Sequence, residues 1–382
     1  MTMNKKYKIL ILGASYGSLL ASKLIMAGHT VSLVCRSETA QLINHEGTRV
    51  RMPVKGRSGQ VEIDSRQWPG RLDAVTPAQA QPAQYDLVCL AMQEPQYGAS
   101  GVRELLRAIA LAKVPCMSIM NMPPLPYLAR IKGIAASECR VCFTDPCVWD
   151  DFDPALMTLC SPDPQAFRPP EEKANVLQVG LPTNFKVARF EISRHNAMLD
   201  QLAADIADAR LLVDGDALDL PVKLKVHDSI FVPLAKWSML LTGNYRCVET
   251  GRMRPIAEAV HADIEKSRQV YEWVSGMCIG LGAAAQDMVA FEKYANAAQG
   301  LLKPSSAARA LIAGATDIER IDLLVKLIAA QMGMQSDVVD ETVKRVNGWL
   351  ERNRQQALVM TASAEISSDR DAKNDAIALA SA

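Results

Sequence analysis

Hydrophobic and polar residues follow a strand, helix, strand order at the start of the chain. The run KILIL at 8–12 is apolar after its first residue, as in a buried strand. Residues 16–27 repeat leucine and isoleucine at helical spacing, and Gly28 stands where a C-terminal cap is expected. The β-rich run HTVSLVC at 29–35 follows. This order predicts a βαβ unit at the start of the chain.

Two further apolar runs have the length and composition of buried parallel strands. They are YDLVCLAM at 85–92 and PCMSIMN at 115–121, and the residues ASGVRELLRAIALA between them have helical spacing. Alternation of strands and helices predicts a doubly wound, mostly parallel sheet. We therefore expect an α/β Rossmann-type domain over residues 1–215.

The composition changes in the middle of the chain. Residues from about 123 to 182 are rich in Pro, Asp and Cys, and SPDPQAFRPPEE is an evident loop. We expect a long insertion here, bordered by the strand-like runs VLQVGL and FKVARFEI. The insertion belongs to the first domain in this prediction.

The second half of the chain repeats apolar residues at helical spacing, which predicts an all-α domain over 216–360. Residues 361–382 have no aromatic residue and little periodicity, so a mobile tail is expected there. The expected helices are 223–247, 255–280, 305–331 and 337–355.

Charge and hydropathy exclude several partners. The 42 Lys and Arg residues balance 42 Asp and Glu residues, so no global field favours nucleic acid or an anionic membrane. The apolar run at 7–12 is too short for a signal peptide, and no apolar stretch reaches the roughly 20 residues that span a bilayer. We expect a soluble, cytoplasmic protein that binds neither nucleic acid nor membrane.

The nine cysteines have no framework spacing, which indicates reduced thiols. Cys139, Cys142 and Cys147 raise the possibility of zinc, but the run RVCF alternates like a strand and no fourth ligand completes the set. No metal site is expected.

The run GASYG at 13–17 permits two interpretations. It fits G-x-S-x-G, which would make Ser15 the nucleophile of a hydrolase. It also fits a dinucleotide-binding turn that is one residue short and has Ser15 in place of the middle glycine. A nucleophile elbow needs an oxyanion donor from an earlier strand and a histidine base, and neither is evident here. The dinucleotide interpretation is therefore preferred, with Gly13, Ser15, Tyr16 and Gly17 at the pyrophosphate.

The end of the second strand indicates which dinucleotide binds. An acidic residue at this position favours NAD, whereas a cation favours the 2′-phosphate of NADP. Here the residue is Arg36, followed by Ser37. We therefore expect NADP(H) as the cofactor. The alternative is that Arg36 is an ordinary solvated charge.

Several spaced groups of residues occur in the same order as motifs of one family. The sequence resembles the ketopantoate reductase family over most of residues 7–357. The resemblance implies an NADPH-dependent 2-keto acid reductase with a Rossmann domain and a helical C-terminal domain. The matched positions are Gly13 and Gly17, Arg36, Asn121 in IMNMPP, Lys236 and Asn244 at eight-residue spacing, Ser305-Ser306, and Thr316-Asp317-Ile318-Glu319.

The resemblance implies roles for these residues. Lys236 is the candidate general acid, because an ammonium group can protonate the oxygen charge left by hydride transfer. Asp317 matches the family's glutamate and would orient the lysine or bind the product hydroxyl. Asn121, Asn244 and Ser305 would contact cofactor and substrate, Ser305 through a substrate carboxylate. The alternatives are a solvated helix charge for Lys236 and turn or cap roles for Asn244, Asp317 and Ser305.

The sequence also departs from the family pattern. Leu240 replaces an asparagine that would contact substrate, and Gln93 replaces a lysine near the cofactor, although Gln96 persists. Asp317 is one methylene shorter than the family's glutamate. Because of these departures, the resemblance supports the class of reaction, a reduction, more than it supports a particular substrate.

Three functions remain in competition. The first is an NADPH-dependent reductase of a 2-keto acid or related small-molecule carbonyl. The second is an opine-type dehydrogenase that reduces an imine, for which His227 and Asp228 would be the histidine and its acid partner. The third is a non-catalytic NADP-binding protein. The oligomeric state stays open, with a homodimer as one possibility.

Overall fold

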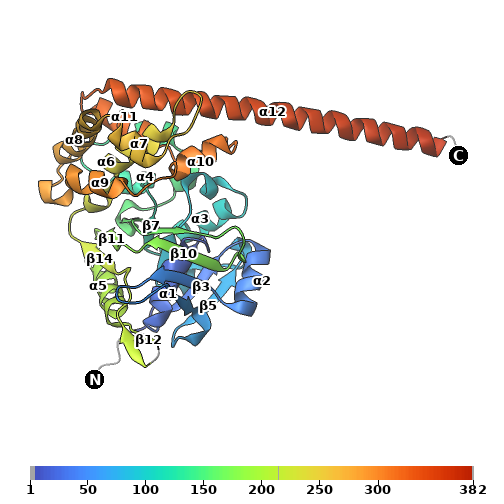
Figure 1. The fold of residues 1–382 in the computed structure, drawn as a ribbon. Coiled ribbons are helices and arrows are strands. Elements are labelled where there is room, and N and C mark those ends of the chain that lie inside the picture. Colours follow the sequence, from blue (N-terminus) through green and yellow to red (C-terminus); the bar gives the residue numbers. More distant parts are fainter. Residues whose placement is uncertain (1–4, 214, 381–382) are drawn as a thin grey trace. The chain divides into compact units, whose positions relative to one another are not determined.

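The computed structural model describes residues 5–213 and 215–380, which form the two compact units of Figure 1. The first unit comprises Met1–Trp237, Ser275–Val289 and Glu319–Met334. Its centre is an eight-stranded sheet in the order β14-β11-β8-β7-β6-β1-β2-β5. The six strands from β8 to β5 in this order are mutually parallel. They are β1 (Lys8–Leu12), β2 (Thr30–Val34), β5 (Arg71–Val75), β6 (Leu87–Leu90), β7 (Cys116–Ile119) and β8 (Met157–Ser161).

Helices cover the sheet, as the continuous apolar runs of its strands require. Helix α1 (Gly17–Met26) is buried along its whole length, because β2 and β3 and helix α5 (Ser193–Asp208) all pack against it. Helices α2 (Ser37–Glu46) and α3 (Val102–Leu111) bury one apolar face each. The predicted doubly wound α/β domain is therefore confirmed.

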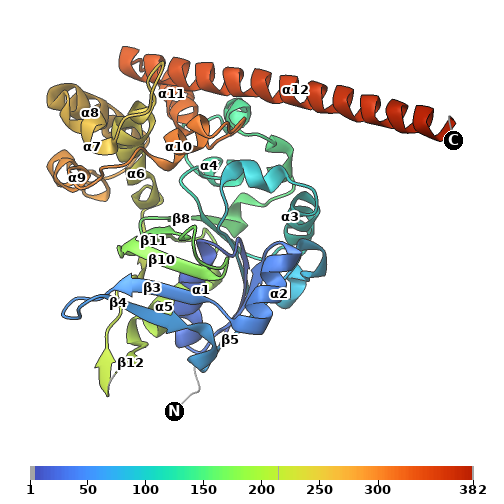
Figure 2. The ribbon, with the colours of Figure 1, turned by 45° about the vertical axis from the view of Figure 1, so that its right-hand side comes forward.

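The segment 123–182, expected as an insertion, contributes strands to both larger sheets of the first unit. It supplies β8 to the main sheet, after the short helix α4 (Leu125–Leu128). It also supplies β9 (Gln165–Phe167) and β10 (Val176–Leu181) to a second sheet of order β4-β3-β10-β9, which Figure 2 shows beside α1. The other two strands of that sheet, β3 (Arg49–Pro53) and β4 (Gln60–Asp64), form an antiparallel hairpin.

The sheet extends past the predicted domain boundary at residue 215. Strand β11 (Phe185–Ala188) runs antiparallel to β8, and β14 (Leu224–His227) runs parallel to β11. A helix over 223–247 was therefore the wrong prediction for its first residues. The run LKVH is too short to show a period, and it completes the edge of the sheet. A small hairpin of β12 (Leu211–Val213) and β13 (Asp216–Leu218) precedes it.

The strand predicted from the run RVCF was also wrong. Residues Ala136–Cys142 form a 3-10 helix, and Cys139 and Cys142 face inward. Helix α11 (Ile321–Gln331) packs on this 3-10 helix, and Gln331 accepts from the Ala135 N–H at 2.8 Å. Part of the C-terminal helical region thus belongs to the first unit.

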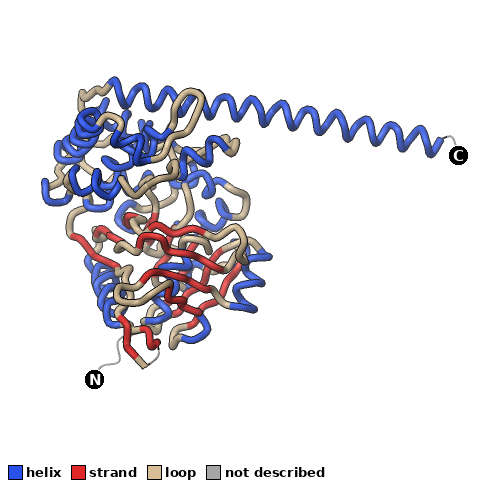
Figure 3. The backbone as a smooth tube through the Cα atoms, viewed as in Figure 1, coloured by secondary structure: helices blue, strands red, loops and turns tan. Residues whose placement is uncertain are grey.

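The second unit is helical, as predicted, and the strands from β1 to β14, drawn in red in Figure 3, all lie in the first unit. Its chain segments are Ser238–Val274, Ala290–Ile318 and Gln335–Ala382. The remaining helices of the described chain are α6 (Lys236–Met239), α7 (Ile256–His261), α8 (Ile264–Gly280), α9 (Phe291–Ala298), α10 (Ser306–Ile312) and α12 (Asp337–Ala380).

Helix α12 includes residues 361–380, where the sequence led us to expect a tail. Alanine is frequent in this stretch and has the highest helix propensity, which accounts for the helical conformation. Residues 381–382 lie outside the described residues. Within the described part of the chain, no helix combines the length and the apolar character needed to cross a membrane.

Candidate functional site

The glycine turn lies at the carboxyl end of β1, where ligands bind in doubly wound sheets. Gly13 has φ +107°, and a Cβ there would lie 2.6 Å from the Ala91 carbonyl oxygen. A Cβ on Gly17 would lie 2.6 Å from Cγ2 of Ile11. Both positions therefore require glycine, the first for its dihedral angle and the second for the close approach of α1 to β1. The N-terminus of α1 is left facing the turn, where it favours phosphate.

Ser15 lies in this turn without the partners of a nucleophile. Its carbonyl oxygen accepts from the N–H of Ser18 at 3.2 Å and from the Ser18 hydroxyl at 2.7 Å. Among the described residues, no histidine hydrogen-bonds to the Ser15 hydroxyl. This arrangement gives the hydrolase interpretation no base.

Tyr16 connects the glycine turn to the segment after β8. Its hydroxyl donates to the Pro164 carbonyl at 2.8 Å, and its ring meets the Phe185 ring edge-on at 5.9 Å between centroids. Burial raises the pKa of Tyr16 well above its ordinary value. Tyr16 thus fixes the turn to the neighbouring loop as a neutral donor.

Arg36 follows β2 and is exposed at the start of α2. Arg168, which follows β9, lies close enough for the two charges to interact. Burial, together with the repulsion from Arg36, lowers the pKa of Arg168. Within the described chain neither guanidinium pairs with a carboxylate. Sequence reasoning missed Arg168, because a loop arginine carries no periodic signal.

Gln93 and Gln96 follow β6 and are both exposed. The side-chain oxygen of Gln96 accepts from the Gln93 N–H at 3.0 Å, which caps the 3-10 helix Glu94–Gly98. Because β6 runs parallel to β1, both residues lie at the same carboxyl edge of the sheet as the glycine turn. A contact with cofactor stays a prediction.

Lys236 begins α6, and its side chain is only 23% exposed. Its Nζ donates to the Pro162 carbonyl at 2.7 Å and lies 3.8 Å from Oδ1 of Asp163. Burial lowers the pKa of Lys236, while the charges of Asp163 and Glu319 oppose that effect. Lys236 is thus a partly desolvated ammonium group between two carboxylates and not an ordinary solvated helix charge.

Asn121 follows β7 and contacts two neighbours of Lys236: Trp237, the next residue in the chain, and Glu319. Its carbonyl oxygen accepts from the indole N–H of Trp237 at 3.3 Å, and its side chain hydrogen-bonds to Glu319. Its Oδ1 is buried without a hydrogen-bond partner. A buried acceptor of this kind is costly unless a ligand donates to it.

Glu319, which sequence reasoning did not select, joins this cluster. Burial raises its pKa to about 7, although hydrogen bonds from the Asn121 side chain and the Glu94 N–H act in the opposite direction. Glu94 is itself buried and accepts from the Thr144 N–H at 2.9 Å. The sequence did indicate an acidic residue here, because TDIE contains both Asp317 and Glu319. Their spacing does not show which of the two faces the lysine.

Asp317 has other partners. Its carboxylate pairs with Arg354 at 2.8 Å and accepts from the Thr316 hydroxyl at 3.0 Å. It belongs to the second unit, whereas Lys236, Asn121 and Glu319 belong to the first. Both partners of the Asp317 side chain lie in the second unit as well, and a role for Asp317 at the lysine stays a prediction.

The remaining predicted substrate residues also lie in the second unit. Ser305 is buried and caps α10: its hydroxyl accepts from the Ala308 N–H at 3.1 Å and donates to the Asn244 carbonyl at 2.7 Å. This cap role is the alternative that its residue type suggested. Leu240 is buried in the π-helical turn Leu240–Asn244. The roles of Asn244, Ser305 and Leu240 at a substrate stay predictions.

Among the described residues, no hydrogen bond joins His227 to Asp228, the pair of the opine alternative. The Asp228 carboxylate is 91% exposed and forms an ion pair with Arg189. His227 ends β14, and burial lowers its pKa.

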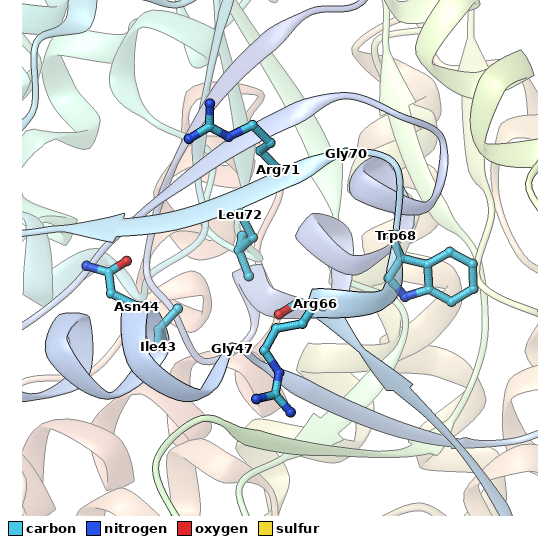
Figure 4. A pocket seen from close by; sticks show the side chains of 9 residues that line it. Ile43, Asn44, Gly47, Arg66, Trp68, Gly70, Arg71 and Leu72 are labelled. Atoms are coloured by element: carbon cyan, nitrogen blue, oxygen red, sulfur yellow. The ribbon is translucent and has the colours of Figure 1, made fainter.

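A separate pocket lies at the opposite, amino edge of the sheet, beside the start of β5 and the end of α2. Figure 4 shows Arg66 and Arg71 pointing away from each other. Arg66 pairs with Asp64 at 2.8 Å, and the Asn44 amide bonds to the backbone of Ala74. The fold already uses these polar groups, so we assign no ligand to this pocket.

The residues at the carboxyl edge fit a dinucleotide. Glycine at positions 13 and 17 keeps the turn free of side chains, and Arg36 and Arg168 form no ion pair with a carboxylate of the described residues. The Oδ1 of Asn121 is buried and has no hydrogen-bond partner.

Comparison with solved structures identifies the fold. The 2-dehydropantoate 2-reductase from Methylococcus capsulatus is 15% identical, with a TM-score of 0.61 over 91% of this chain and 97% of that one. The dimeric ketopantoate reductase from Staphylococcus aureus is 11% identical, with a TM-score of 0.55 over 91% and 99%. D-mandelate dehydrogenase in complex with NADH is 14% identical, with a TM-score of 0.53 over 90% and 99%.

No family model and no curated protein matches the sequence. The structural matches nevertheless span nine-tenths of the chain and nearly all of each compared chain. The chain therefore shares the fold of these solved reductases, an α/β Rossmann-type part followed by a helical part. More narrowly, its fold is that of ketopantoate reductases, as the sequence resemblance predicted.

Proposed function

We propose that this protein is an NADPH-dependent reductase of a 2-keto acid or a closely related carbonyl compound. The observation that carries the proposal is the position of Lys236, partly desolvated, beside Asn121 and Glu319 and at the same sheet edge as the glycine turn. The keto acid reductase fold supports the same reaction.

The side chains of this cluster suit carbonyl reduction. A bound reduced nicotinamide supplies the hydride. Lys236 donates a hydrogen bond to the substrate carbonyl oxygen and then its proton, so that the product is an alcohol. Asn121 offers its unpartnered Oδ1 to a donor on cofactor or substrate, and its amide holds Glu319. We propose Glu319, rather than Asp317, as the acidic partner of Lys236.

We propose Arg36 and Arg168 as the groups that select NADP(H) over NAD(H). Both carry a guanidinium without a carboxylate partner in the described chain, and a 2′-phosphate would supply the missing anion. The glycine turn with Gly13, Ser15, Tyr16 and Gly17 would hold the pyrophosphate. Gln93 and Gln96 would lie along the nicotinamide half.

Binding and turnover test this function separately. Titration of the purified protein with NADPH and NADH should show tighter binding of NADPH. NADPH oxidation should then be screened with 2-keto acids, β-diketones and aromatic ketones. Failure to bind either cofactor at submillimolar concentration would sink the proposal, and binding without turnover on the whole panel would instead support a non-catalytic NADP-binding protein.

The proposed assembly is a homodimer. The support is the S. aureus ketopantoate reductase of the same fold, which is dimeric. Light scattering on the purified protein, with and without NADPH, decides between monomer and dimer.

A further inference from the structure

Asp163 contacts two lysines at the carboxyl edge of the sheet. Its Oδ2 lies 3.0 Å from Nζ of Lys186 on β11, and its Oδ1 lies 3.8 Å from Nζ of Lys236. The Ser161 hydroxyl donates to the same Oδ1. The Asp163 side chain is 18% exposed, so water screens these interactions only in part. Asp163 is therefore held by two hydrogen-bond donors, Ser161 and Lys186, and interacts through its charge with the candidate general acid Lys236.

The backbone around Asp163 is stiff. Pro162 and Pro164 flank it, and each proline ring fixes its own φ angle. The Asp163 N–H donates to the Ser161 carbonyl at 3.0 Å, which closes a tight turn. The two proline carbonyls accept from Lys236 at 2.7 Å and from Tyr16 at 2.8 Å. This turn is therefore fixed at once to the lysine and to the glycine turn.

Lys236 must carry a proton to act as a general acid, and its surroundings must keep it charged. Three charged groups face it: Asp163 from the turn after β8, Glu319 before α11, and Lys186 from β11. Because burial raises the pKa of Glu319 to about 7, that carboxylate is not a constant negative charge at neutral pH. Glu94 faces Glu319 and adds to this effect.

The charge of Asp163 is more constant. Burial raises its pKa, but the ammonium groups of Lys236 and Lys186 and the hydrogen bond from Ser161 outweigh burial, so the pKa lies below its ordinary value. Asp163 thus stays ionised over the whole neutral range, whereas Glu319 does not. Lys186 acts in the opposite direction on Lys236, by repulsion and by sharing the same carboxylate.

We propose that Asp163 is a positioning residue of the reductase site, which fixes Nζ of Lys236 at the carboxyl edge of the sheet and keeps it protonated at neutral pH. Lys186 weakens this effect, because it repels the ammonium group of Lys236 and shares the Asp163 carboxylate. The inference rests on the proposed function for its role in turnover, but the protonation of Lys236 can be measured without turnover.

The test compares Asp163→Asn, Asp163→Glu and Lys186→Met with the wild type. Trace acetic anhydride labels free amines, and mass spectrometry of the peptide that carries Lys236 gives its labelling rate as a function of pH. Asp150→Asn is the matched control, because Asp150 is 49% exposed and pairs with Arg140 away from the lysine.

We expect Asp163→Asn to speed the labelling of Lys236 about tenfold at neutral pH, since loss of the carboxylate favours the free amine. Asp163→Glu should restore most of the wild-type rate. Lys186→Met should slow labelling, which is a change of opposite sign that general loosening of the site would not produce. Asp150→Asn should leave the rate unchanged.

The same variants show the consequence for catalysis. The alkaline limb of kcat/KM for NADPH-dependent reduction should move to lower pH in Asp163→Asn and to higher pH in Lys186→Met. An unchanged labelling profile in both variants would overturn the inference, whatever the activity. Shifted labelling in a protein that reduces no carbonyl would uphold the protonation of Lys236 by Asp163 and overturn the reductase function instead.

Discussion

The side chain of Asn121 donates a hydrogen bond to the carboxylate of Glu319. Asp317, two residues earlier, pairs instead with Arg354 at 2.8 Å. Glu319→Gln should therefore lower kcat/KM at neutral pH by about tenfold or more, because it removes one of the two carboxylates near Lys236. It should also remove an ionisation near pH 7 from the pH profile, since burial raises the pKa of Glu319 to about 7.

Asp317→Asn is the matched control for this prediction. It should change kcat/KM by less than about threefold and lower stability only slightly, because an exposed ion pair contributes about 0–1 kcal/mol. If Asp317→Asn were the more damaging substitution, the assignment of Glu319 would be reversed.

Lys236→Met should lower kcat by about 100-fold or more and leave NADPH affinity nearly unchanged, as expected for loss of a general acid. Stopped-flow turnover and a fluorescence titration of NADPH measure the two quantities. Lys225→Met, an exposed lysine on β14, should behave as wild type. His227→Ala should also retain turnover. Loss of turnover in His227→Ala would favour the opine-type reaction instead.

Arg36→Ala should weaken NADPH binding about 10-fold to 100-fold and leave NADH binding unaffected. Removal of one charge-assisted contact to the 2′-phosphate costs about 1.5–3 kcal/mol. Isothermal titration with both cofactors gives the comparison. An equal loss for the two cofactors would place Arg36 away from the 2′-phosphate.

Ser15→Ala should keep most of the reductase activity, because its hydroxyl meets no histidine among the described residues. A catalytic serine would cost about a millionfold in kcat when removed. Steady-state NADPH oxidation by the variant decides between the two interpretations of the glycine turn.

Lys23 on α1 is buried, and its Nζ donates to the Pro221 carbonyl at 3.2 Å. Burial lowers its pKa from 10.5 to about 7. Between these two pH values the unfolded chain binds more protons than the folded one, so the free energy of unfolding gains up to about 1.4 kcal/mol per pH unit as pH rises. Below pH 7 the cost of burying the charge is constant.

Lys23→Met should raise the free energy of unfolding at neutral pH and remove this dependence. The measurement is the difference in unfolding free energy between variant and wild type at several pH values from 7 upward, which cancels the titration of other groups. A difference that does not change with pH would mean that Lys23 stays charged when folded.

Local spacing was sufficient to predict the glycine turn and Arg36, because each follows an apolar run that reads as a strand. Asn121 and Lys236 were predicted from the family resemblance, and the roles of all these residues at a cofactor or substrate stay predictions. Glu319 was missed because TDIE offers two acidic residues, and the sequence does not show that the first unit includes Glu319 and the helix α11 that follows it.

Asp163 and Arg168 could not be found from periodicity. They lie in the irregular chain around β9, and their positions depend on the pairing of β8 with β7, about 40 residues earlier, and of β9 with β10. Strand β14 was mistaken for helix for a related reason: four residues are too few for a period, and their pairing with β11 determines their conformation.

The first unit is assembled from three separate stretches of chain, the last of which ends at Met334. A ribosome must therefore complete most of the polypeptide before the residues around Lys236 can meet Glu319. Domains otherwise tend to fold as units while synthesis continues. A chain that ended before residue 319 would keep the glycine turn, Asn121 and Lys236 but would lack Glu319, one of the two carboxylates near that lysine.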